Sequence, residues 1–346
     1  MTYFALTRRR WLAASLAVAA TVASLGAAPQ ALAQEKDEVV LGALRFTSHS
    51  AGFIAHEKGY FDEEGLDVSF EFFQAAQPIA VATAAGDVDF GVAGVTGGLM
   101  NLAEKDAIRI VAGVLSEKKG VDGMMIMASN DAWEDGLKTP ADIRGRSLAM
   151  TQVGSSFHYM MNFIAEGEGF DLDEVRLTPL QKVGSMIGAL KSGQVDAMIM
   201  VPHVAKPLVA SGGAKEIGWL NQYAEYQIST LFTSVENIET DPDMVERFIR
   251  AYARGIADFN RVMLDEDADP AELEEMTRMI HKYVYTDQPF EKAAPSIQAG
   301  AMYLNPNAAL NKTGVAAHMQ WFKDEGLVQT DLDVDQLVDD SFVETY

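Results

Sequence analysis

The chain has 346 residues and no cysteine, and its 27 lysines and arginines face 50 aspartates and glutamates, for a formal net charge of −23 at pH 7. So acidic a balance argues against nucleic acids and anionic membrane surfaces as partners. The lack of cysteine excludes disulfides and thiolate metal sites. The length is sufficient for two domains that each have a hydrophobic core.

The N-terminal segment has the pattern of an export signal. Three arginines at 8–10 precede an apolar run over 11–25, and residues 31–33 form an A-x-A cleavage pattern. The run is shorter than the roughly 20 apolar residues that span a bilayer. Residues 7–12 match the twin-arginine (Tat) signal, with an ordinary secretory signal as the alternative. We therefore predict a signal peptide over 1–33, cleaved near Ala33, and a periplasmic mature protein without direct membrane insertion.

Strands and helices are expected to alternate after this segment. The first half contains apolar or alternating strand patterns at 39–44, 66–73, 90–95 and 108–115, with helical patterns at 50–58, 78–85 and 97–104. The alternation starts again with strands at 124–128, 147–151, 175–180 and 197–201, and with helices at 139–145, 155–166 and 182–191. A strand at 226–233 then returns to the first lobe, and helices follow at 242–264, 270–283 and 313–325. Such alternation predicts mainly parallel sheets with helices on both faces.

An internal repeat divides the chain into two similar halves. Residues 82–89 and 189–196 both read as a helix end, a glycine and then Val-Asp before an apolar strand. Gly86 and Gly193 stand where a helix C-terminus favours a left-handed residue. We therefore predict an α/β fold with two lobes, in which lobe 1 comprises 38–124 plus 228–346 and lobe 2 comprises 125–227. Two crossing strands join the lobes and permit hinge closure on a small molecule in the cleft.

The segment 151–158 is the most specific local signal for a binding site. A strand ends there, Gly154 turns the chain, and Ser155 and Ser156 open a helix that carries His158 about one turn further on. Free N–H groups and the positive end of the helix dipole favour an anion at such a point. The alternative is that a serine simply caps the helix and no ligand binds.

Other loops are expected to face the same cleft, because ligands bind beyond the carboxyl ends of parallel strands. Two tyrosines before the return strand are candidates for contacts with the body of the ligand. The candidate residues outside 151–158 are Thr47, Ser48, His49, Gln74, Thr96, His203, Tyr223 and Tyr226. The histidine spacing has no metal-ligand character, so hydrogen bonding is favoured and no metal site is predicted. Asp87, Asp89 and Asp196 are assigned turn and capping roles.

Several motifs together resemble one protein family. They lie at 55–68, 85–91, 138–145, 152–158 and 192–197. Over 38–346 the chain resembles periplasmic substrate-binding proteins of ABC importers, in the branch with the sulfonate, taurine and nitrate binders and the thiamine-pyrimidine-precursor (NMT1/THI5-like) proteins. The resemblance implies the two-lobed type II periplasmic-binding-protein fold and an anion beside Gly154, Ser155, Ser156 and His158. Met200 and Val201 depart from the sulfonate pattern, which has an aromatic residue and an acid there.

The expected function is capture of a small organic anion, a sulfonate or an aromatic or aliphatic carboxylate, and its delivery to an inner-membrane ABC permease and its ATPase. We expect a monomer without cofactor or metal. No nucleophile-elbow, phosphate-loop or dinucleotide motif occurs, so no enzymatic activity is predicted. Pyrimidine binding is the alternative. A pyrimidine-synthesising enzyme and a ligand-presenting sensor on the same fold are less favoured, the former because that branch is cytosolic and carries cysteine motifs.

Overall fold

A computed structural model describes residues 36–328 and 331–346 of the chain. The expected signal peptide at 1–33 lies outside the described residues. In the described part, no helix combines the length and the apolar character needed to cross a membrane.

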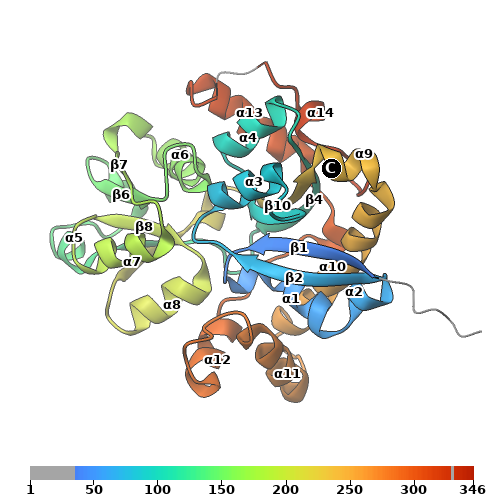
Figure 1. The fold of residues 1–346 in the computed structure, drawn as a ribbon. Helices are drawn as coiled ribbons and strands as arrows, with labels where there is room; N and C mark the ends of the chain where they lie inside the picture. The colour runs from blue at the N-terminus through green and yellow to red at the C-terminus, as the bar shows by residue number, and fades with distance from the viewer. Residues whose placement is uncertain (1–35, 329–330) are drawn as a thin grey trace, which may run out of the picture. The chain divides into compact units, whose positions relative to one another are not determined.

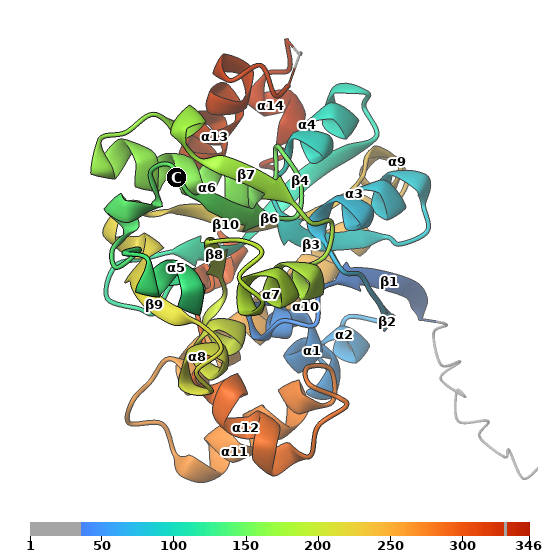
Figure 2. The same ribbon diagram turned by 90° about the vertical axis from the view of Figure 1, so that its left-hand side faces the viewer.

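Two five-stranded sheets with helices around them form the fold (Figures 1 and 2). The strands of the first sheet are β1 (Asp37–Ala43), β2 (Leu66–Phe72), β3 (Phe90–Gly94), β4 (Ile108–Glu117) and β10 (Tyr226–Ser234). Their order is β2-β1-β3-β10-β4, and β10 runs antiparallel to both of its neighbours. The prediction that the chain returns to the first sheet at 226–233 is confirmed.

The second sheet repeats this arrangement. Its strands are β5 (Met125–Ala128), β6 (Ser147–Met150), β7 (Arg176–Pro179), β8 (Ala197–Met200) and β9 (Lys215–Trp219). Their order is β7-β6-β8-β5-β9, with β5 antiparallel to β8 and β9. Each sheet is therefore mixed, with four strands in one direction and one against them. The edge strand β9 was not predicted.

The repeated aspartates make the same contact in both sheets. Asp89 Oδ2 accepts a hydrogen bond from the Val40 N–H at 2.7 Å, and Asp196 Oδ2 accepts one from the Ser147 N–H at 2.7 Å. The sequence separation is 49 residues in each case. Each carboxylate thus satisfies a backbone donor of the neighbouring strand, a structural role that differs from the turn and capping roles expected from the sequence.

Helices follow most strands and also make up most of the C-terminal third. Those between strands are α1 (Ser50–Glu57), α2 (Tyr60–Glu63), α3 (Ala76–Ala85), α4 (Gly97–Glu104), α5 (Asn130–Glu134), α6 (Ser156–Glu168), α7 (Val183–Lys191) and α8 (Pro202–Ala210). Those after β10 are α9 (Val235–Thr240), α10 (Pro242–Met263), α11 (Pro270–His281), α12 (Phe290–Gln298), α13 (Lys312–Asp324) and α14 (Val334–Leu337). Short 3₁₀ helices are η1 (Thr47–His49), η2 (Pro140–Ile143), η3 (Leu172–Glu174), η4 (Leu220–Gln222) and η5 (Pro306–Ala308).

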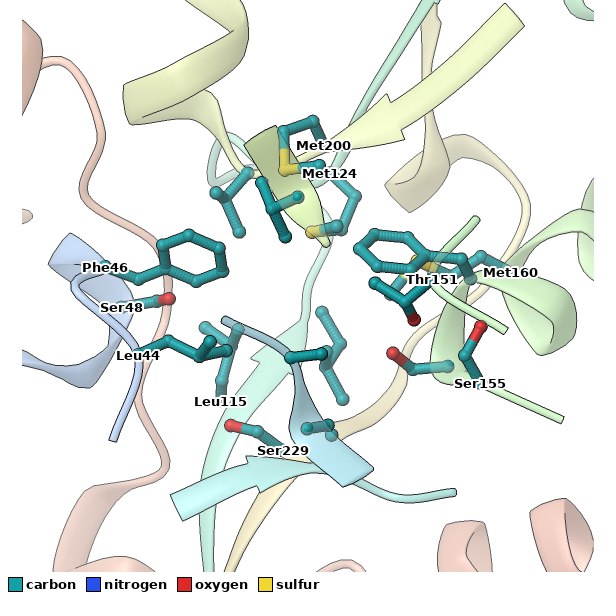
Figure 3. Close-up of a pocket in the computed structure, with 18 of the residues that line it drawn as sticks. Leu44, Phe46, Ser48, Leu115, Met124, Thr151, Ser155, Met160, Met200 and Ser229 are labelled. Carbon is teal, nitrogen blue, oxygen red and sulfur yellow. The ribbon is translucent and has the colours of Figure 1, made fainter. Parts of the chain in front are cut away.

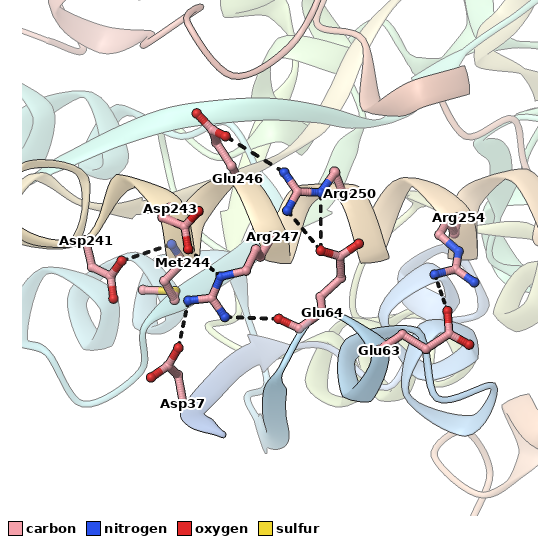
Figure 4. A network of polar contacts seen from close by, with 10 residues as sticks. All are labelled: Asp37, Glu63, Glu64, Asp241, Asp243, Met244, Glu246, Arg247, Arg250 and Arg254. Atoms are coloured by element: carbon pink, nitrogen blue, oxygen red, sulfur yellow. Dashed lines mark hydrogen bonds and ion pairs between the residues drawn. The ribbon is translucent and has the colours of Figure 1, made fainter. Parts of the chain in front are cut away.

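The long helix α10 is fixed to the first sheet by core packing and by arginines. Its buried face includes Phe248, whose ring stacks on Phe90 of β3 with centroids 3.9 Å apart. On the solvent side Arg247 bonds to Asp37 at 2.7 Å and to the Glu64 carbonyl at 3.0 Å, as Figure 4 shows. Exposed ion pairs contribute about 0–1 kcal/mol each, so burial of the apolar face is the larger contribution.

We call the first sheet and its helices lobe 1, and the second sheet and its helices lobe 2. The chain crosses from lobe 1 to lobe 2 between β4 and β5, and it returns between β9 and β10. The expected boundary at 124/125 falls in the first crossing, whereas the one at 227/228 falls just inside β10. Lobe 2 is therefore a continuous insertion between two strands that pair with each other in lobe 1.

Candidate functional site

A cavity is lined by residues of both lobes (Figure 3). About 60 Å³ inside it admits the centre of a water molecule. The four strand-to-helix loops singled out in the sequence all reach it, through Ser48 and His49, Gly94, Ser155, and Val201.

The wall of this cavity is mostly apolar. The larger apolar side chains that line it are Leu44, Phe46, Leu115 and Ile228 of lobe 1, and Met124, Phe157, Met160, Val183, Met200 and Val201 of lobe 2 or the first crossing. No lysine, arginine, aspartate or glutamate is among the described lining residues. The cavity therefore suits a ligand with an apolar body and at most a small charge.

Three buried hydroxyl groups in the wall have no hydrogen-bond partner in the described residues. Ser48, Ser155 and Ser229 are each at most 2% exposed, and their Oγ atoms have no hydrogen-bond partner in the described part of the protein. They come from different segments and lie on different sides of the cavity (Figure 3). Buried polar atoms are normally paired, and these three are the unpartnered hydroxyls of the described lining.

The start of α6 is built as expected, but Ser155 does not cap it. Ser155 occupies the N-cap position with extended backbone (φ −83°, ψ 167°), yet its side chain makes no capping hydrogen bond. Gly154 before it has φ +74°, a conformation that glycine adopts without strain. The Ser155 hydroxyl is thus free beside the positive end of a 13-residue helix. This geometry favours the anion interpretation over simple capping.

His49 is a neutral hydrogen-bond donor in the wall. Its Nδ1 accepts a hydrogen bond from the Leu44 N–H at 3.1 Å, so the neutral ring carries its proton on Nε2. Burial lowers the pKa of His49 to about 3, because the charged ring cannot be solvated there. At neutral pH this histidine can donate one hydrogen bond but contributes no positive charge.

The structure places some of the sequence candidates in the cavity and others elsewhere. Ser48, His49, Ser155 and Ser156 line the cavity together. Thr96 lies outside the lining and caps α4, because its Oγ1 accepts from the Leu99 N–H at 3.1 Å. His158 also lies outside it, and its Nδ1 accepts from the Gly154 N–H at 3.3 Å, so these two residues hold the loop.

The remaining candidates lie at varying positions outside the lining. Thr47 is buried and is not a lining residue, and Gln74 is exposed. His203 packs edge-on against Phe46 with centroids 5.1 Å apart; burial, and then the neighbouring His49, lower its pKa to about 3. The Tyr223 hydroxyl donates to Glu168 within lobe 2.

Tyr226 lines a different cavity, at the crossings between the lobes.

Sequence reasoning missed most of the apolar wall and also Ser229. Leu115 lies on β4, Ile228 and Ser229 lie on β10, and Met124 lies in the first crossing, so none of them belongs to a strand-to-helix loop. The sequence could have indicated Ser229, because β10 carries hydroxyl residues within a strand that is otherwise apolar and buried, and such residues can mark a binding site. In the described part of the chain, no group of three or more histidine, aspartate or glutamate side chains is placed to hold a metal.

The lobes are in direct contact beside the cavity. The Gly97 N–H at the start of α4 donates to the Gly154 carbonyl of lobe 2 at 3.0 Å. Tyr159 of α6 stacks on His318 of α13, with ring centroids 3.8 Å apart and planes at 11°. At Gly94, an added Cβ would lie 2.9 Å from Ser156 Oγ. The structure therefore shows the lobes closed at the α6 side.

Two sheets of this strand order, with a cavity shared by both lobes, define the periplasmic-binding-protein fold. The chain belongs to the NMT1/THI5-like family, whose model matches residues 46–261. Four Brucella proteins are 27% identical over 144 residues, which is 42% of this chain and 41% of each relative, so the chain spans less than half of their length. The formylaminopyrimidine-binding protein of Halalkalibacterium halodurans is 26% identical over 231 residues, 64% of this chain and 66% of that protein.

Solved structures share the fold at low sequence identity. The alkanesulfonate-binding protein SsuA from Xanthomonas axonopodis pv. citri, bound to MOPS, has a TM-score of 0.70 at 16% identity and covers 89% of this chain and 99% of its own. Other neighbours include an aliphatic sulphonate-binding protein and a nitrate-binding protein. One neighbour is an enzyme, the desulfurization enzyme DSZB, which has a TM-score of 0.59 at 15% identity and covers 89% of this chain and 97% of its own.

Proposed function

We propose that this protein is an extracytoplasmic substrate-binding protein of an ABC importer that closes on a small organic anion with an apolar body. The supporting observation is the set of three unpartnered, buried hydroxyls of Ser48, Ser155 and Ser229 in an otherwise apolar cavity between two lobes. Two lobes joined by two crossings can open and close, and a permease can distinguish the closed, liganded form.

The charge of the site favours a ligand that carries no more than one negative charge. Serine hydroxyls, the Nε2–H of His49 and the start of α6 supply donors and a partial positive charge, but the described lining holds no cation. A carboxylate or sulfonate on an aromatic or short alkyl body matches this donor set and lets Met124, Met200 and Phe157 pack on its apolar part. A bare inorganic anion would leave that apolar wall without contacts.

A neutral pyrimidine is the second candidate ligand. The same uncharged lining favours it, and a relative in sequence is a formylaminopyrimidine-binding protein.

Catalysis is not proposed, since burial keeps the pKa of His49 at about 3 and makes it a poor general base at neutral pH. The expected partners are an ABC permease and its ATPase, the expected location is the periplasm, and the expected state is monomeric.

A thermal-shift screen tests this function. The mature protein is mixed with sulfonates, aromatic and aliphatic carboxylates, nitrate, taurine and pyrimidines. A ligand at 100 times its dissociation constant stabilises by about 2.7 kcal/mol, which raises the melting temperature by several degrees at this size. A shift with a carboxylate or sulfonate supports the anion proposal, a shift with pyrimidines alone replaces it, and mass spectrometry of denatured protein detects a ligand that copurifies.

Removing a lining hydroxyl should weaken binding of the ligand found in that screen. We expect Ser155→Ala and Ser229→Ala each to raise its dissociation constant roughly tenfold or more, because a hydrogen bond to a charged group contributes about 1.5–3 kcal/mol. Ser50→Ala is the matched control, since Ser50 is also buried with an unpartnered Oγ but does not line the cavity. Unchanged affinity in calorimetry for both lining variants would show that the hydroxyls do not contact the ligand.

A further inference from the structure

The cavity lined by both lobes, which we call the first cavity, is small. About 60 Å³ inside it admits the centre of a water molecule. A buried water molecule needs roughly 10–15 Å³ of such space, so the first cavity holds about four to six atoms other than hydrogen. An apolar protein cavity that binds benzene measures about 150 Å³. An aromatic ring that carries a carboxylate is therefore too large for the first cavity in this closed structure.

Contacts between the lobes fix the width of the first cavity on its α6 side. The Gly97 N–H of lobe 1 donates to the Gly154 carbonyl of lobe 2 at 3.0 Å. Gly94 and Ser156 line the cavity from the two lobes, and an added Cβ at Gly94 would lie 2.9 Å from Ser156 Oγ. The gap between them is thus too narrow even for a methyl group. On this side the cavity can widen only if the lobes separate.

The opposite side of the cavity is fixed by α8. Figure 3 shows Phe46 and Ser155 on opposite sides of the cavity, and the Phe46 ring of lobe 1 packs on His203 of α8 with centroids 5.1 Å apart. The Tyr285 hydroxyl, from the C-terminal part of lobe 1, donates to the His203 carbonyl at 2.7 Å. A Cβ added at Gly300 would overlap His203, so these segments are in direct contact. A larger ligand would break contacts between the lobes on both sides.

The polar groups of the first cavity suit the head of a small carboxylate. The buried hydroxyls of Ser48, Ser155 and Ser229 are free to donate hydrogen bonds, and Ser155 stands at the positive end of α6. The described lining contains no lysine or arginine, so a second negative charge on the ligand would be left unmatched. A single carboxylate, with two acceptor oxygens, uses these donors and takes little of the available space.

Two methionines limit the space for the rest of the ligand. Met124 and Met200 lie across the cavity from Ser229 (Figure 3), and they are 2% and 0% exposed. Thioether side chains adapt their shape to an apolar neighbour. An alkyl chain whose carboxylate is held by the serines would end against these two side chains, so their length determines how long the chain can be.

We propose that the first cavity selects a short-chain monocarboxylate of about two to four carbon atoms and that Met124 and Met200 set this limit. The inference rests on the proposed function and narrows its ligand class. Acetate, propionate and butyrate have four, five and six atoms other than hydrogen, which matches the space in the closed cavity. Hexanoate has eight and benzoate nine, so both require the lobes to stay partly open.

Calorimetry with five sodium carboxylates at equal ionic strength tests the size limit. We expect acetate, propionate or butyrate to bind most tightly, and hexanoate and benzoate to bind at least tenfold more weakly than the best of them. Tightest binding of hexanoate or benzoate would overturn the size limit and leave the proposed function intact. Binding of none of the five would also overturn the inference, and the response to sulfonates and pyrimidines in the thermal-shift screen then decides whether the proposed function survives.

Shortening a lining methionine tests its role. Met200→Ala leaves extra space at the end of the cavity, so the affinity for hexanoate relative to propionate should rise at least tenfold. Met198→Ala is the matched control, because Met198 lies on the same strand β8 and is also 0% exposed but does not line the cavity. Met124→Ala is the second lining variant, in case Met200→Ala does not fold. A ratio unchanged from the wild type in the folded lining variants would overturn the role of the methionines.

Discussion

Replacing Gly94 by valine is expected to lower the affinity for the ligand of the first cavity roughly tenfold to a hundredfold. Gly94 ends β3 in lobe 1, and a Cβ there would lie 2.9 Å from Ser156 Oγ and 3.1 Å from Ser156 Cβ, at the start of α6 in lobe 2. Overpacking of a close contact costs about 1–3 kcal/mol. Because the clash exists only when the lobes are closed, this free energy opposes closure and therefore opposes binding.

The matched control is Gly188→Val on α7 of lobe 2, where an added Cβ meets nothing within 4 Å. Both variants should keep the melting temperature of the ligand-free protein within a few degrees, and only Gly94→Val should lose the stabilisation by ligand. In small-angle X-ray scattering, added ligand should reduce the radius of gyration of the wild type but not that of Gly94→Val, whose lobes stay open. Wild-type affinity in Gly94→Val would show that the lobes do not need this contact to bind.

Acidification is expected to destabilise the protein steeply below about pH 6.5. Burial lowers the pKa of His49, His203 and His318 to about 3 and that of His158 to about 4. In the unfolded chain these rings titrate near 6.5, so below that pH the unfolded state binds more protons than the folded state. Each histidine then lowers the free energy of unfolding by about 1.4 kcal/mol per pH unit.

Glu117 acts in the opposite direction. Its pKa is raised to about 8 in the folded state, so between about pH 4.5 and 8 the folded state holds a proton that the unfolded state has lost. Stability therefore falls with rising pH over that range by about 1.4 kcal/mol per unit. Four histidines outweigh one carboxyl below pH 6.5, and only Glu117 acts between 6.5 and 8, so we expect maximum stability near pH 6.5.

Urea unfolding at pH 4.5, 5.5, 6.5 and 8 measures this profile. His318→Phe is the informative variant, because phenylalanine keeps the stack on Tyr159 and removes two buried ring nitrogens that have no partner in the described structure. It should lower the slope on the acid side by about 1.4 kcal/mol per unit and raise stability. A flat profile between pH 4.5 and 6.5 would mean that these histidines are solvated in the native state.

The regular elements were predictable because their patterns are local. The Gly-x-Val-Asp repeat placed β3 and β8 correctly, but the hydrogen bonds of Asp89 and Asp196 to neighbouring strands depend on long-range pairing and were not predicted. The direction of β5 was not predictable, because it depends on pairing with β8 and β9 far along the chain. Strand β9 was missed because Lys215–Trp219 is short and polar, and only pairing at the sheet edge makes it a strand.

Predicting the candidate site required knowing which side of each loop faces inward. The four loops reach one cavity because parallel strands place their carboxyl ends together. Which side chain of a loop enters the cavity depends on local hydrogen bonds, so Ser155 lines it while His158 holds Gly154 instead. The contribution of Leu115 and Ser229 depends on the register of β4 against β10, which the sequence alone does not specify.

The pairing of Tyr226 with Glu117 has a consequence for the modular construction of the molecule. The residue that leaves lobe 1 and the residue that re-enters it stand opposite each other in an antiparallel ladder, which is the geometry that a two-residue hairpin turn connects. Excising residues 118–225 and joining the cut ends through Asn-Gly would leave every strand of the first sheet in place. Lobe 1, the larger part of the described chain, can thus be viewed as a scaffold with lobe 2 inserted at a single point.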